Sequence, residues 1–390
     1  MKKKILRVLS YVLVAALASG ITFGYLLHIA GPVRKLDELQ DLIEERFVGD
    51  YDVTDVEDAA ADAMIQALGD PWSYYIPAAD YTEYAEQMEN SYVGIGITIS
   101  QLPDGSGLLV ESVQAGGPAE AAGMLAGDVI VMIDDQSTQD MTTLEAKNLV
   151  RGEVGTSLTL TVLRQGEAQS LYVTRQQVDI EVASGEMLTG EIGLVRIANF
   201  DTRCAKETLA AIEQLRESGV KALIFDVRNN PGGYASELVK VLDYLLPEGE
   251  LFRAVDYTGK TTVDKSDANY LDMPMVVLVN GDSYSAAEFF AAALQEYGVA
   301  KVVGEQTVGK GYFQNTFQFD DGSAVGLSVG KYFTPKGNSL ANVGITPDIP
   351  VPVEQDIANQ IYAGKIEHDQ DPQLQKALEH LEEVLAKKKT

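Results

Sequence analysis

The sequence is poor in cysteine and histidine, two residue types that bind metals and carry catalysis in many proteins. It has one cysteine and three histidines among 390 residues. A single cysteine cannot close a disulfide within the chain, and Cys204, in a helical pattern without a nearby histidine, is interpreted as a buried structural thiol. His28 lies in the apolar N-terminal segment, and His368 and His380 lie in the charged C-terminal tail. A metal site built from His and Cys, or a Ser-His-Asp triad in the core, is therefore not expected, and no cofactor is predicted.

Positive charge is also scarce. The chain has 30 Lys and Arg residues but 58 Asp and Glu residues, which gives a formal net charge of −28. Such a chain repels phosphate backbones, so nucleic acid is not an expected partner. The hydrophobic fraction of 46% and the charged fraction of 23% are typical of a globular protein. The length suggests two or three domains.

Residues 8–33 carry no charged side chain, and as a helix they are long enough to cross a membrane. Four basic residues precede this stretch within residues 2–7, and five acidic residues follow within residues 37–45. By the positive-inside rule the remainder lies outside the cytoplasm. We expect a single-pass anchor in a bacterial cell membrane with an extracytoplasmic remainder. The alternative is a signal peptide cleaved after Ala16-Leu17-Ala18, which exports the remainder as well.

The apolar pattern changes several times along the chain after the cytoplasmic stub and anchor at residues 1–35. Helical spacing dominates residues 36–90. Short strand-like runs, among them residues 92–100 and 157–164, alternate with short helical runs over residues 91–178. From 179 to 352, buried runs such as ALIFDV and VVLVN alternate with amphipathic helices, which indicates βα units with parallel strands. Residues 353–390 end in a helix that begins at Asp371 and Pro372. The predicted fold class is α/β.

Ser285 follows the apolar run PMVVLVN and begins a helical pattern. A strand-to-helix turn exposes a hydroxyl beside helix N–H groups, which suits a nucleophile. The alternative is a helix cap, because Ser285 and Glu288 form the capping-box pattern S-x-x-E, and Ser283 is a second candidate on the same turn. Without a histidine in this region the base would be a lysine whose pKa is lowered by burial. Lys310, between two glycines, is the strongest candidate, with a solvated surface lysine as the alternative.

Three glycine-containing motifs offer exposed backbone. Gly232-Gly233 in DVRNNPGGY presents N–H groups after a buried strand, although the same letters also form a plain turn. Gly94 and Gly96 would let a peptide backbone approach a sheet edge, or would only serve a tight turn. Residues 304–311, GEQTVGKG, approach the P-loop pattern, but Gly311 replaces the hydroxyl that binds Mg²⁺. A nucleotide site is therefore not expected.

Four motifs resemble, in order along the chain, those of the carboxyl-terminal processing (tail-specific) proteases. They are GDPWSYYIP at 69–77, DVRNNPGGY at 226–234, VNGDSYSAAEFF at 279–290 and GNSLANVGITPDIPV at 337–351. The separations from Ser285 to Lys310 (310 − 285 = 25) and from Lys310 to Gln314 (314 − 310 = 4) also match that family. Tyr284, Ala287 and Trp72 depart from its usual residues.

This resemblance implies a serine endopeptidase whose core is similar to the ClpP/crotonase-like fold. It implies that Ser285 is the nucleophile, Lys310 the general base and Gln314 the partner that orients the lysine. The oxyanion would be held by the N–H of Ala286 together with that of Gly232 or Gly233. A catalytically silent scaffold or adaptor at the membrane surface is the alternative function.

Residues 91–178 resemble a PDZ domain, with Val93-Gly94-Ile95-Gly96 as the carboxylate-binding loop and residues 118–128 as a later signature. The resemblance implies protein or peptide substrates with apolar C-termini. Arg151, at the end of the predicted PDZ helix, is a hypothetical partner of a substrate carboxylate or of the protease core. A solvated helix-end cation is the alternative. Residues 36–69 and 371–389 are candidate homodimer surfaces, and packing within one chain is the alternative for both.

Overall fold

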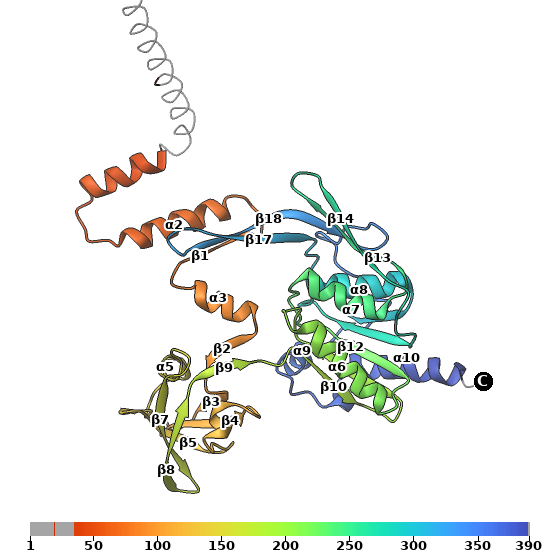
Figure 1. Ribbon diagram of the computed structural model, residues 1–390, viewed down its shortest axis with the longest axis horizontal. Coiled ribbons are helices and arrows are strands. Elements are labelled where there is room, and N and C mark those ends of the chain that lie inside the picture. The colour runs from red at the N-terminus through yellow and green to blue at the C-terminus, as the bar shows by residue number, and fades with distance from the viewer. Residues whose placement is uncertain (1–18, 20–34, 389–390) are drawn as a thin grey trace, which may run out of the picture. The chain divides into compact units, whose positions relative to one another are not determined.

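The computed structural model describes residue 19 and residues 35–388, and the chain divides into two compact parts, Met1–Ala63 and Met64–Thr390 (Figure 1). The predicted anchor at residues 8–33 lies outside the described residues apart from Ser19. Within the described residues, no helix is both long and apolar enough to cross a membrane.

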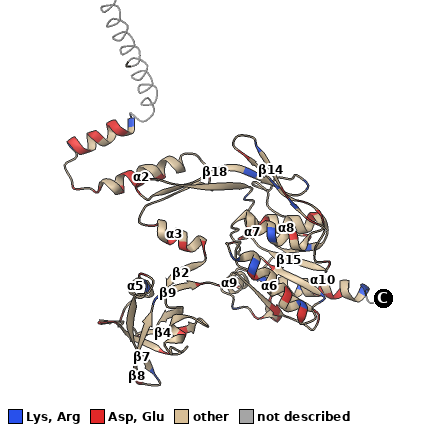
Figure 2. Cartoon of the chain, in the orientation of Figure 1, with Lys and Arg blue, Asp and Glu red and all other residues tan. Residues whose placement is uncertain are grey.

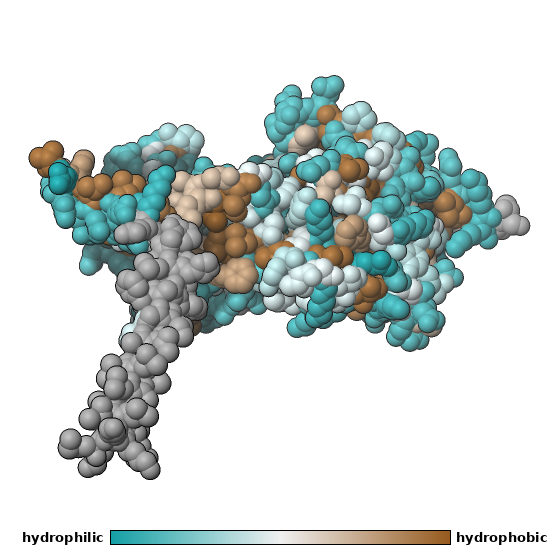
Figure 3. Space-filling model, turned by 90° about the horizontal axis from the view of Figure 1, so that it is seen from above, coloured by the Kyte–Doolittle hydropathy of each residue, from teal (hydrophilic) through white to brown (hydrophobic). Residues whose placement is uncertain are grey.

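The first part is helical, as its apolar spacing predicts. One helix covers residues 35–46, and α2 covers Val53–Gln66 and so continues into the second part. Leu36, Leu39 and Leu42 are 43%, 52% and 52% exposed, and apolar surface is visible over these helices (brown in Figure 3). Acidic residues are frequent in the same helices (red in Figure 2). The helices are thus formed with much of their apolar face at the surface.

Residues 91–179 form a lobe whose six-stranded antiparallel sheet has the order β3-β4-β5-β7-β8, with β6 paired to β5. The strands are β3 (Ile97–Gln101), β4 (Leu108–Val113), β5 (Val129–Ile133), β6 (Gln136–Ser137), β7 (Ser157–Arg164) and β8 (Glu167–Thr174). Two helices, α4 (Pro118–Ala121) and α5 (Thr143–Val150), pack on the core of this lobe. β7 has the predicted bounds.

The chain enters and leaves this lobe through two strands that pair antiparallel, β2 (Ser91–Gly94) and β9 (Gln176–Asp179). The sequence predicted one strand over residues 92–100, which the structure divides between β2 and β3. The cause is Gly96, whose φ of 75° turns the backbone out of the extended conformation. The helix α3 (Tyr81–Met88) precedes β2.

The core contains a six-stranded sheet in the order β10-β11-β12-β15-β16-β19, in which only β10 runs antiparallel to its neighbour. The strands are β10 (Ala183–Met187), β11 (Ile192–Ile197), β12 (Ala222–Asp226), β15 (Met275–Val279), β16 (Ala300–Gly304) and β19 (Ile349–Pro350). This confirms the predicted parallel strands of the βα units. Strands buried on both faces explain the continuous apolar runs.

Helices cover both faces of this sheet. In β15, Met275, Val277 and Val279 pack on one side against α6 (Cys204–Glu217), α7 (Ala235–Leu245) and α8 (Ala286–Tyr297). Val276 and Leu278 point to the other side, toward α10 (Pro372–Lys388). The alternation follows from the two-residue period of a strand.

The C-terminal helix α10 packs within the chain. Leu374, Ala377 and Leu381 are at most 1% exposed and complete the second face of the sheet. The Asp371 carboxylate accepts the N–H groups of Gln373 (3.0 Å) and Leu374 (3.1 Å), which caps the predicted helix start. Of the two alternatives for residues 371–389, the structure therefore shows packing within one chain. A shorter helix, α9 (Gln355–Tyr362), precedes it.

A second, antiparallel sheet of five strands carries the segment that follows Lys310. Its strands are β1 (Tyr74–Ile76), β13 (Gly249–Asp256), β14 (Thr261–Ser266), β17 (Tyr312–Gln318) and β18 (Ala324–Phe333). Both β1 and β17 pair with β18. The loops that precede β1 and β17 therefore lead into the same sheet. The sequence did not predict the β13–β14 hairpin, because charged residues interrupt its apolar alternation.

Candidate active site

Ser285 lies on the turn between β15 and α8, and its backbone has φ 58° and ψ −124°. A non-glycine residue rarely adopts a positive φ, and such strain persists only where surrounding bonds enforce it. Here the Ser285 N–H donates to Oε2 of Glu288 (3.0 Å), and the Glu288 N–H donates to the Ser285 carbonyl oxygen (2.9 Å). The predicted helix start is thus held through the backbone of Ser285, and the residue is half-buried.

Ser283, the second candidate on this turn, has a different environment. It is fully buried, and its hydroxyl donates to the carbonyl oxygen of Val227 (2.7 Å). The Ser283 hydroxyl oxygen accepts the Asn280 N–H (3.1 Å). Ser283 therefore fastens the turn to the end of β12, and its hydroxyl is engaged in that role.

The motif DVRNNPGGY lies directly beside this turn. The Asn229 N–H donates to Oδ1 of Asn280 (2.9 Å), whose Nδ2 donates back to Oδ1 of Asn229 (2.7 Å). The Tyr284 N–H donates to the Asn230 carbonyl oxygen (3.1 Å). A Cβ atom at Gly232, which has φ 93°, would lie 2.7 Å from Cβ of Ser285. The motif therefore needs glycine at this position so that the two loops can meet.

The three predicted oxyanion donors differ in how they are bonded. The Gly232 N–H donates to the side-chain oxygen of Asn230 (2.8 Å) and is occupied. Across the described chain, no hydrogen bond uses the N–H of Gly233, which is exposed, or that of Ala286, the first residue of α8. Of the two glycines that the sequence left open, Gly233 is the one with a free donor.

Glu288 is a site residue whose full role the sequence did not reveal. It is fully buried, and its carboxylate accepts four hydrogen bonds. Oε2 accepts the N–H groups of Ser285 (3.0 Å) and Lys310 (2.8 Å), while Oε1 accepts the Thr307 hydroxyl (2.5 Å) and the Gly309 N–H (2.7 Å). One carboxylate thus joins the backbones of the candidate nucleophile and the candidate base. It also occupies two N–H groups that a P-loop would offer to phosphate.

The amine of Lys310 rests against two aromatic rings. Its Nζ lies 4.9 Å from the centre of the Trp72 ring and 5.7 Å from that of Tyr284, and these rings stack with centroids 6.1 Å apart. Burial lowers the pKa of Lys310 below its ordinary 10.5, although the carboxylates of Asp70 and Glu288 favour the protonated amine. The structure therefore excludes the alternative of a fully solvated lysine.

The side chains of the predicted catalytic residues are not bonded to one another. Among the described residues, no hydrogen bond joins the Lys310 amine to Ser285 or to Gln314. Gln314 instead donates through Nε2 to the Ser328 hydroxyl (3.0 Å). A β-bulge between Phe313 and Gln314 shifts the register just after Lys310. The structure thus links Ser285 and Lys310 through Glu288, and it does not bring Gln314 to the lysine.

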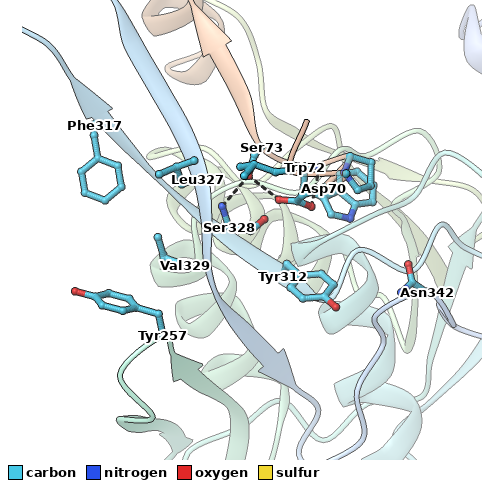
Figure 4. Close-up of a pocket in the computed structure, with 13 residues that line it drawn as sticks. Asp70, Trp72, Ser73, Tyr257, Tyr312, Phe317, Leu327, Ser328, Val329 and Asn342 are labelled. Atoms are coloured by element: carbon cyan, nitrogen blue, oxygen red, sulfur yellow. Dashed lines mark hydrogen bonds between the residues drawn. The ribbon is translucent and has the colours of Figure 1, made fainter. Parts of the chain in front are cut away.

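The loop before β1 holds Trp72 over the lysine. The Asp70 carboxylate accepts the Ser73 hydroxyl (2.6 Å) and the Trp72 N–H (3.2 Å), and the Ser73 hydroxyl accepts the Ser328 N–H (3.1 Å). Burial raises the pKa of Asp70, but these hydrogen bonds outweigh it and the net pKa is lowered. A cavity of about 760 Å³ is lined by this loop and by β17 and β18 (Figure 4).

The predicted peptide-binding loop of the PDZ lobe is divided between two elements. Val93 and Gly94 lie in β2, and Ile95 and Gly96 form the turn before β3. Within the described residues β3 pairs only with β4, and α5 packs near it, so its other edge is open to an added strand. Ile95 is 1% exposed and belongs to the core of the lobe.

Arg151 caps the end of α5 and turns toward α3. Its Nη1 lies 3.2 Å from Oε2 of Glu86, and its guanidinium carbon lies 5.7 Å from the centre of the Tyr92 ring. The neighbouring Lys147 pairs with Glu83 of α3 at 3.0 Å. Arg151 is therefore neither a fully solvated cation nor a residue in contact with the core sheet.

The remaining candidates of the sequence take no part in this site. Cys204 is buried, and burial raises the pKa of its thiol to about 12, as a structural thiol requires. His368 contacts Arg196 (3.2 Å) and Glu186 (3.5 Å) at the far end of the chain. In the part of the chain that the structure describes, no cluster of His, Cys, Asp and Glu could hold a metal ion.

A hydroxyl on a strained turn, the free N–H of Ala286 on the next residue and a half-buried lysine on an adjoining segment are parts that acyl transfer needs. Comparison with known proteins points the same way. The model of peptidase family S41 matches residues 191–351, and that of the PDZ domain matches residues 109–164.

The carboxy-terminal processing protease CtpA of Bacillus subtilis is 35% identical over 321 residues, which cover 81% of this chain and 68% of the relative. A "Probable CtpA-like serine protease" of Staphylococcus aureus is 31% identical over 323 residues, covering 82% and 64%. The chain thus spans about two thirds of the length of these relatives. A solved structure named photosystem II D1 C-terminal processing protease shares 27% identity, with a TM-score of 0.49 and coverage of 86% and 92%. The chain belongs to peptidase family S41, as a PDZ-containing serine peptidase of the carboxy-terminal processing type.

Proposed function

We propose that the chain is an endopeptidase that cleaves peptide bonds through a Ser285 acyl-enzyme, with Lys310 as the general base. The observation that carries this proposal is the Glu288 carboxylate, because its two oxygens hold the backbones of both residues (3.0 and 2.8 Å). The described histidines, His368 and His380, lie in the C-terminal segment, which leaves lysine as the base at hand. The lowered pKa of Lys310 supports a neutral amine.

The proposed reaction begins when the neutral Lys310 amine accepts the proton of Ser285 Oγ as this oxygen attacks the substrate carbonyl carbon. The carbonyl becomes an oxyanion that the N–H groups of Gly233 and Ala286 stabilise. The C–N bond then breaks, and the leaving amine takes the proton from the Lys310 ammonium. Water attacks the acyl-enzyme while Lys310 accepts its proton and returns one to Ser285, which releases the acid product.

This reaction requires the Lys310 amine to leave its place on the rings of Trp72 and Tyr284. Gln314 is the proposed partner that then orients the lysine, since it lies four residues along the same segment. The amide nitrogen of Gln314 is bonded to Ser328, which leaves its carbonyl oxygen as the group that would accept from the amine.

The PDZ lobe supplies the proposed recognition step. An extended C-terminal tail with apolar side chains would add to the open edge of β3 beside α5, with its carboxylate at the turn of Ile95 and Gly96. The unpaired edge of β3 and the positive φ of Gly96 at this turn support the placement. The proposed domains are those of the sequence, with the PDZ domain at 91–178 and the protease core at 179–352.

The location is part of the same proposal. Residues 8–33 would anchor the chain in the cell membrane and leave the catalytic part outside the cytoplasm. The exposed apolar side chains of the first part support a homodimer through residues 36–69, because such a face is commonly covered by a partner.

The decisive experiment is digestion of an unstructured peptide with an apolar, free C-terminus by the purified full chain. Ser285→Ala should be inactive, and Ser283→Ala, the matched control on the same turn, should retain cleavage if it still folds. Equal cleavage by wild type and Ser285→Ala would show that the nucleophile is misassigned. Binding of the peptide by both without cleavage by either would instead identify a silent PDZ scaffold.

A further inference from the structure

The cavity beside the candidate active site has a mixed wall. Figure 4 shows Phe317, Leu327, Val329 and Tyr257 along one side, with Asp70, Trp72 and Ser73 across from them. Its volume of about 760 Å³ falls within the range of ligand pockets, which is about 300 to 1,000 Å³. The apolar side comes from β17, β18 and the β13–β14 hairpin, which belong to one sheet.

The chemistry of the lining selects an uncharged, apolar occupant. Its one carboxylate, Asp70, accepts the Ser73 hydroxyl and the Trp72 N–H of its own loop, and most of the other lining side chains are apolar or aromatic. Phe317 is 46% exposed and Tyr257 is 83% exposed. Aromatic side chains left in water at a concave surface gain most by covering another apolar group.

The cavity adjoins the proposed chemistry through two residues. Trp72, part of its wall, has the Lys310 amine 4.9 Å from the centre of its ring. Tyr312, also in the lining, is the second residue after Lys310 on the same segment. A polypeptide whose carbonyl group is at Ser285 therefore has residues close to the cleaved bond within reach of the cavity.

We propose that this cavity is a substrate subsite that takes one large apolar or aromatic side chain of the polypeptide near the bond to be cleaved. The inference rests on the proposed function and adds a second point of recognition, separate from the PDZ lobe. Substrate choice is then set both by the C-terminal tail and by a large side chain at the cleavage position. The polypeptide fits better than a free small ligand because Trp72 belongs both to the cavity wall and to the rings that contact the Lys310 amine.

The test uses the full chain and a set of peptides with the same tail. Each position from four before to four after the cleaved bond is changed in turn from alanine to phenylalanine, and kcat/KM is measured. Burial of one large apolar side chain predicts one position at which phenylalanine raises kcat/KM about tenfold, or about 1.4 kcal/mol. The all-alanine peptide gives the reference rate.

Two variants remove the apolar wall from opposite ends, Phe317→Asp and Tyr257→Ser. The matched control is Phe319→Asp, because Phe319 is 51% exposed, lies just after β17 and does not line the cavity. The phenylalanine preference should fall to about twofold or less in both wall variants and persist in the control. The all-alanine peptide should be cleaved at the wild-type rate by Phe319→Asp, and the preference of each wall variant is calculated relative to its own rate on that peptide.

An unchanged preference in both wall variants, or no preference at any position in wild type, would overturn the subsite. Loss of a dimer in Phe317→Asp with the preference intact would assign the cavity to a second copy of the chain and would also overturn it. Failure of the proposed function has a different signature, since the all-alanine peptide would then be cleaved no faster by wild type than by Ser285→Ala.

Discussion

The two reacting groups of the candidate site are held in different ways. The turn that carries Ser285 is fixed by backbone and buried side-chain hydrogen bonds, among them those of Ser283, Asn280 and Glu288. Lys310 shares only the backbone part of this arrangement, and its amine lies against the faces of two aromatic rings. The turn of Ser285 is thus preorganised, whereas in the proposed mechanism the Lys310 amine has to move before it can act as the base.

Removal of the proposed base, Lys310, should have the largest effect on activity. We expect Lys310→Met, which keeps a long unbranched side chain but lacks the amine, to lower kcat/KM by about 10³-fold, because general-base catalysis contributes roughly 10² to 10⁴. The measurement is peptide cleavage at fixed pH, with the melting temperature as a check on folding. Lys310→Arg is the matched control, since it keeps a cation on the rings but cannot accept a proton. Full activity of either variant would remove Lys310 from its role.

Removal of the Glu288 carboxylate, which links the backbones of Ser285 and Lys310, should have the second-largest effect. Glu288→Ala leaves four donors without their acceptor, two of them the N–H groups of Ser285 and Lys310. We expect unfolding free energy to fall by about 3–5 kcal/mol, the usual cost of removing one partner of a buried charged network. Denaturant unfolding measures this loss.

Glu288→Gln separates stability from positioning. The variant keeps the shape but has one acceptor oxygen, so one of two donor pairs loses its acceptor: the N–H groups of Ser285 and Lys310, or the Thr307 hydroxyl and the Gly309 N–H. We expect a loss of kcat/KM of about 10²-fold with a smaller loss of stability than in Glu288→Ala. Wild-type activity in Glu288→Gln would show that the shared carboxylate does not position the reacting residues.

The ring contact should control the pH dependence. In the proposed mechanism Lys310 acts only when neutral, so we expect kcat/KM to rise with pH through the pKa of Lys310, which burial lowers. Tyr284→Ala admits water to the amine, which moves the pKa back toward its ordinary value and shifts the rise of activity to higher pH. At neutral pH we expect a loss on the order of a few-fold that disappears at alkaline pH.

Tyr284→Phe is the control for this shift, because it keeps the ring and removes only the hydroxyl. Its profile of kcat/KM against pH should follow wild type. If Tyr284→Ala and Tyr284→Phe give the same profile, the ring does not shield the amine. A shift of Tyr284→Ala to lower pH would mean that attraction of the ammonium to the ring outweighs burial.

Periodicity and local motifs were sufficient to predict several of the strands and helices, including those that carry Ser285. The bounds of β7, the βα units of the core and the start of α8 at Ser285 follow from patterns within a few residues of one another. The contact of Lys310 with Trp72 joins segments 238 residues apart (310 − 72 = 238), so no local pattern carries it. The capping-box signal found Glu288 but assigned it to one helix, because the loop that supplies its other donors meets α8 only in the folded chain.

The smallest expected effect concerns Arg151, whose pair with Glu86 is partly exposed and therefore worth about 0.2–1 kcal/mol. We expect Arg151→Ala to change kcat/KM of a tailed peptide by no more than about fivefold. The guanidinium of Arg151 faces α3, so Arg151→Ala should still prefer a peptide with a free C-terminus over an amidated one. Lys147→Ala breaks the neighbouring pair with Glu83 and should show the same preference. Loss of that preference in Arg151→Ala alone would show that Arg151 leaves Glu86 to bind the substrate carboxylate. An unchanged rate in Arg151→Ala would count against a regulatory role for Arg151. Control of the Lys310 amine would then be left to the residues that contact it, Trp72 and Tyr284.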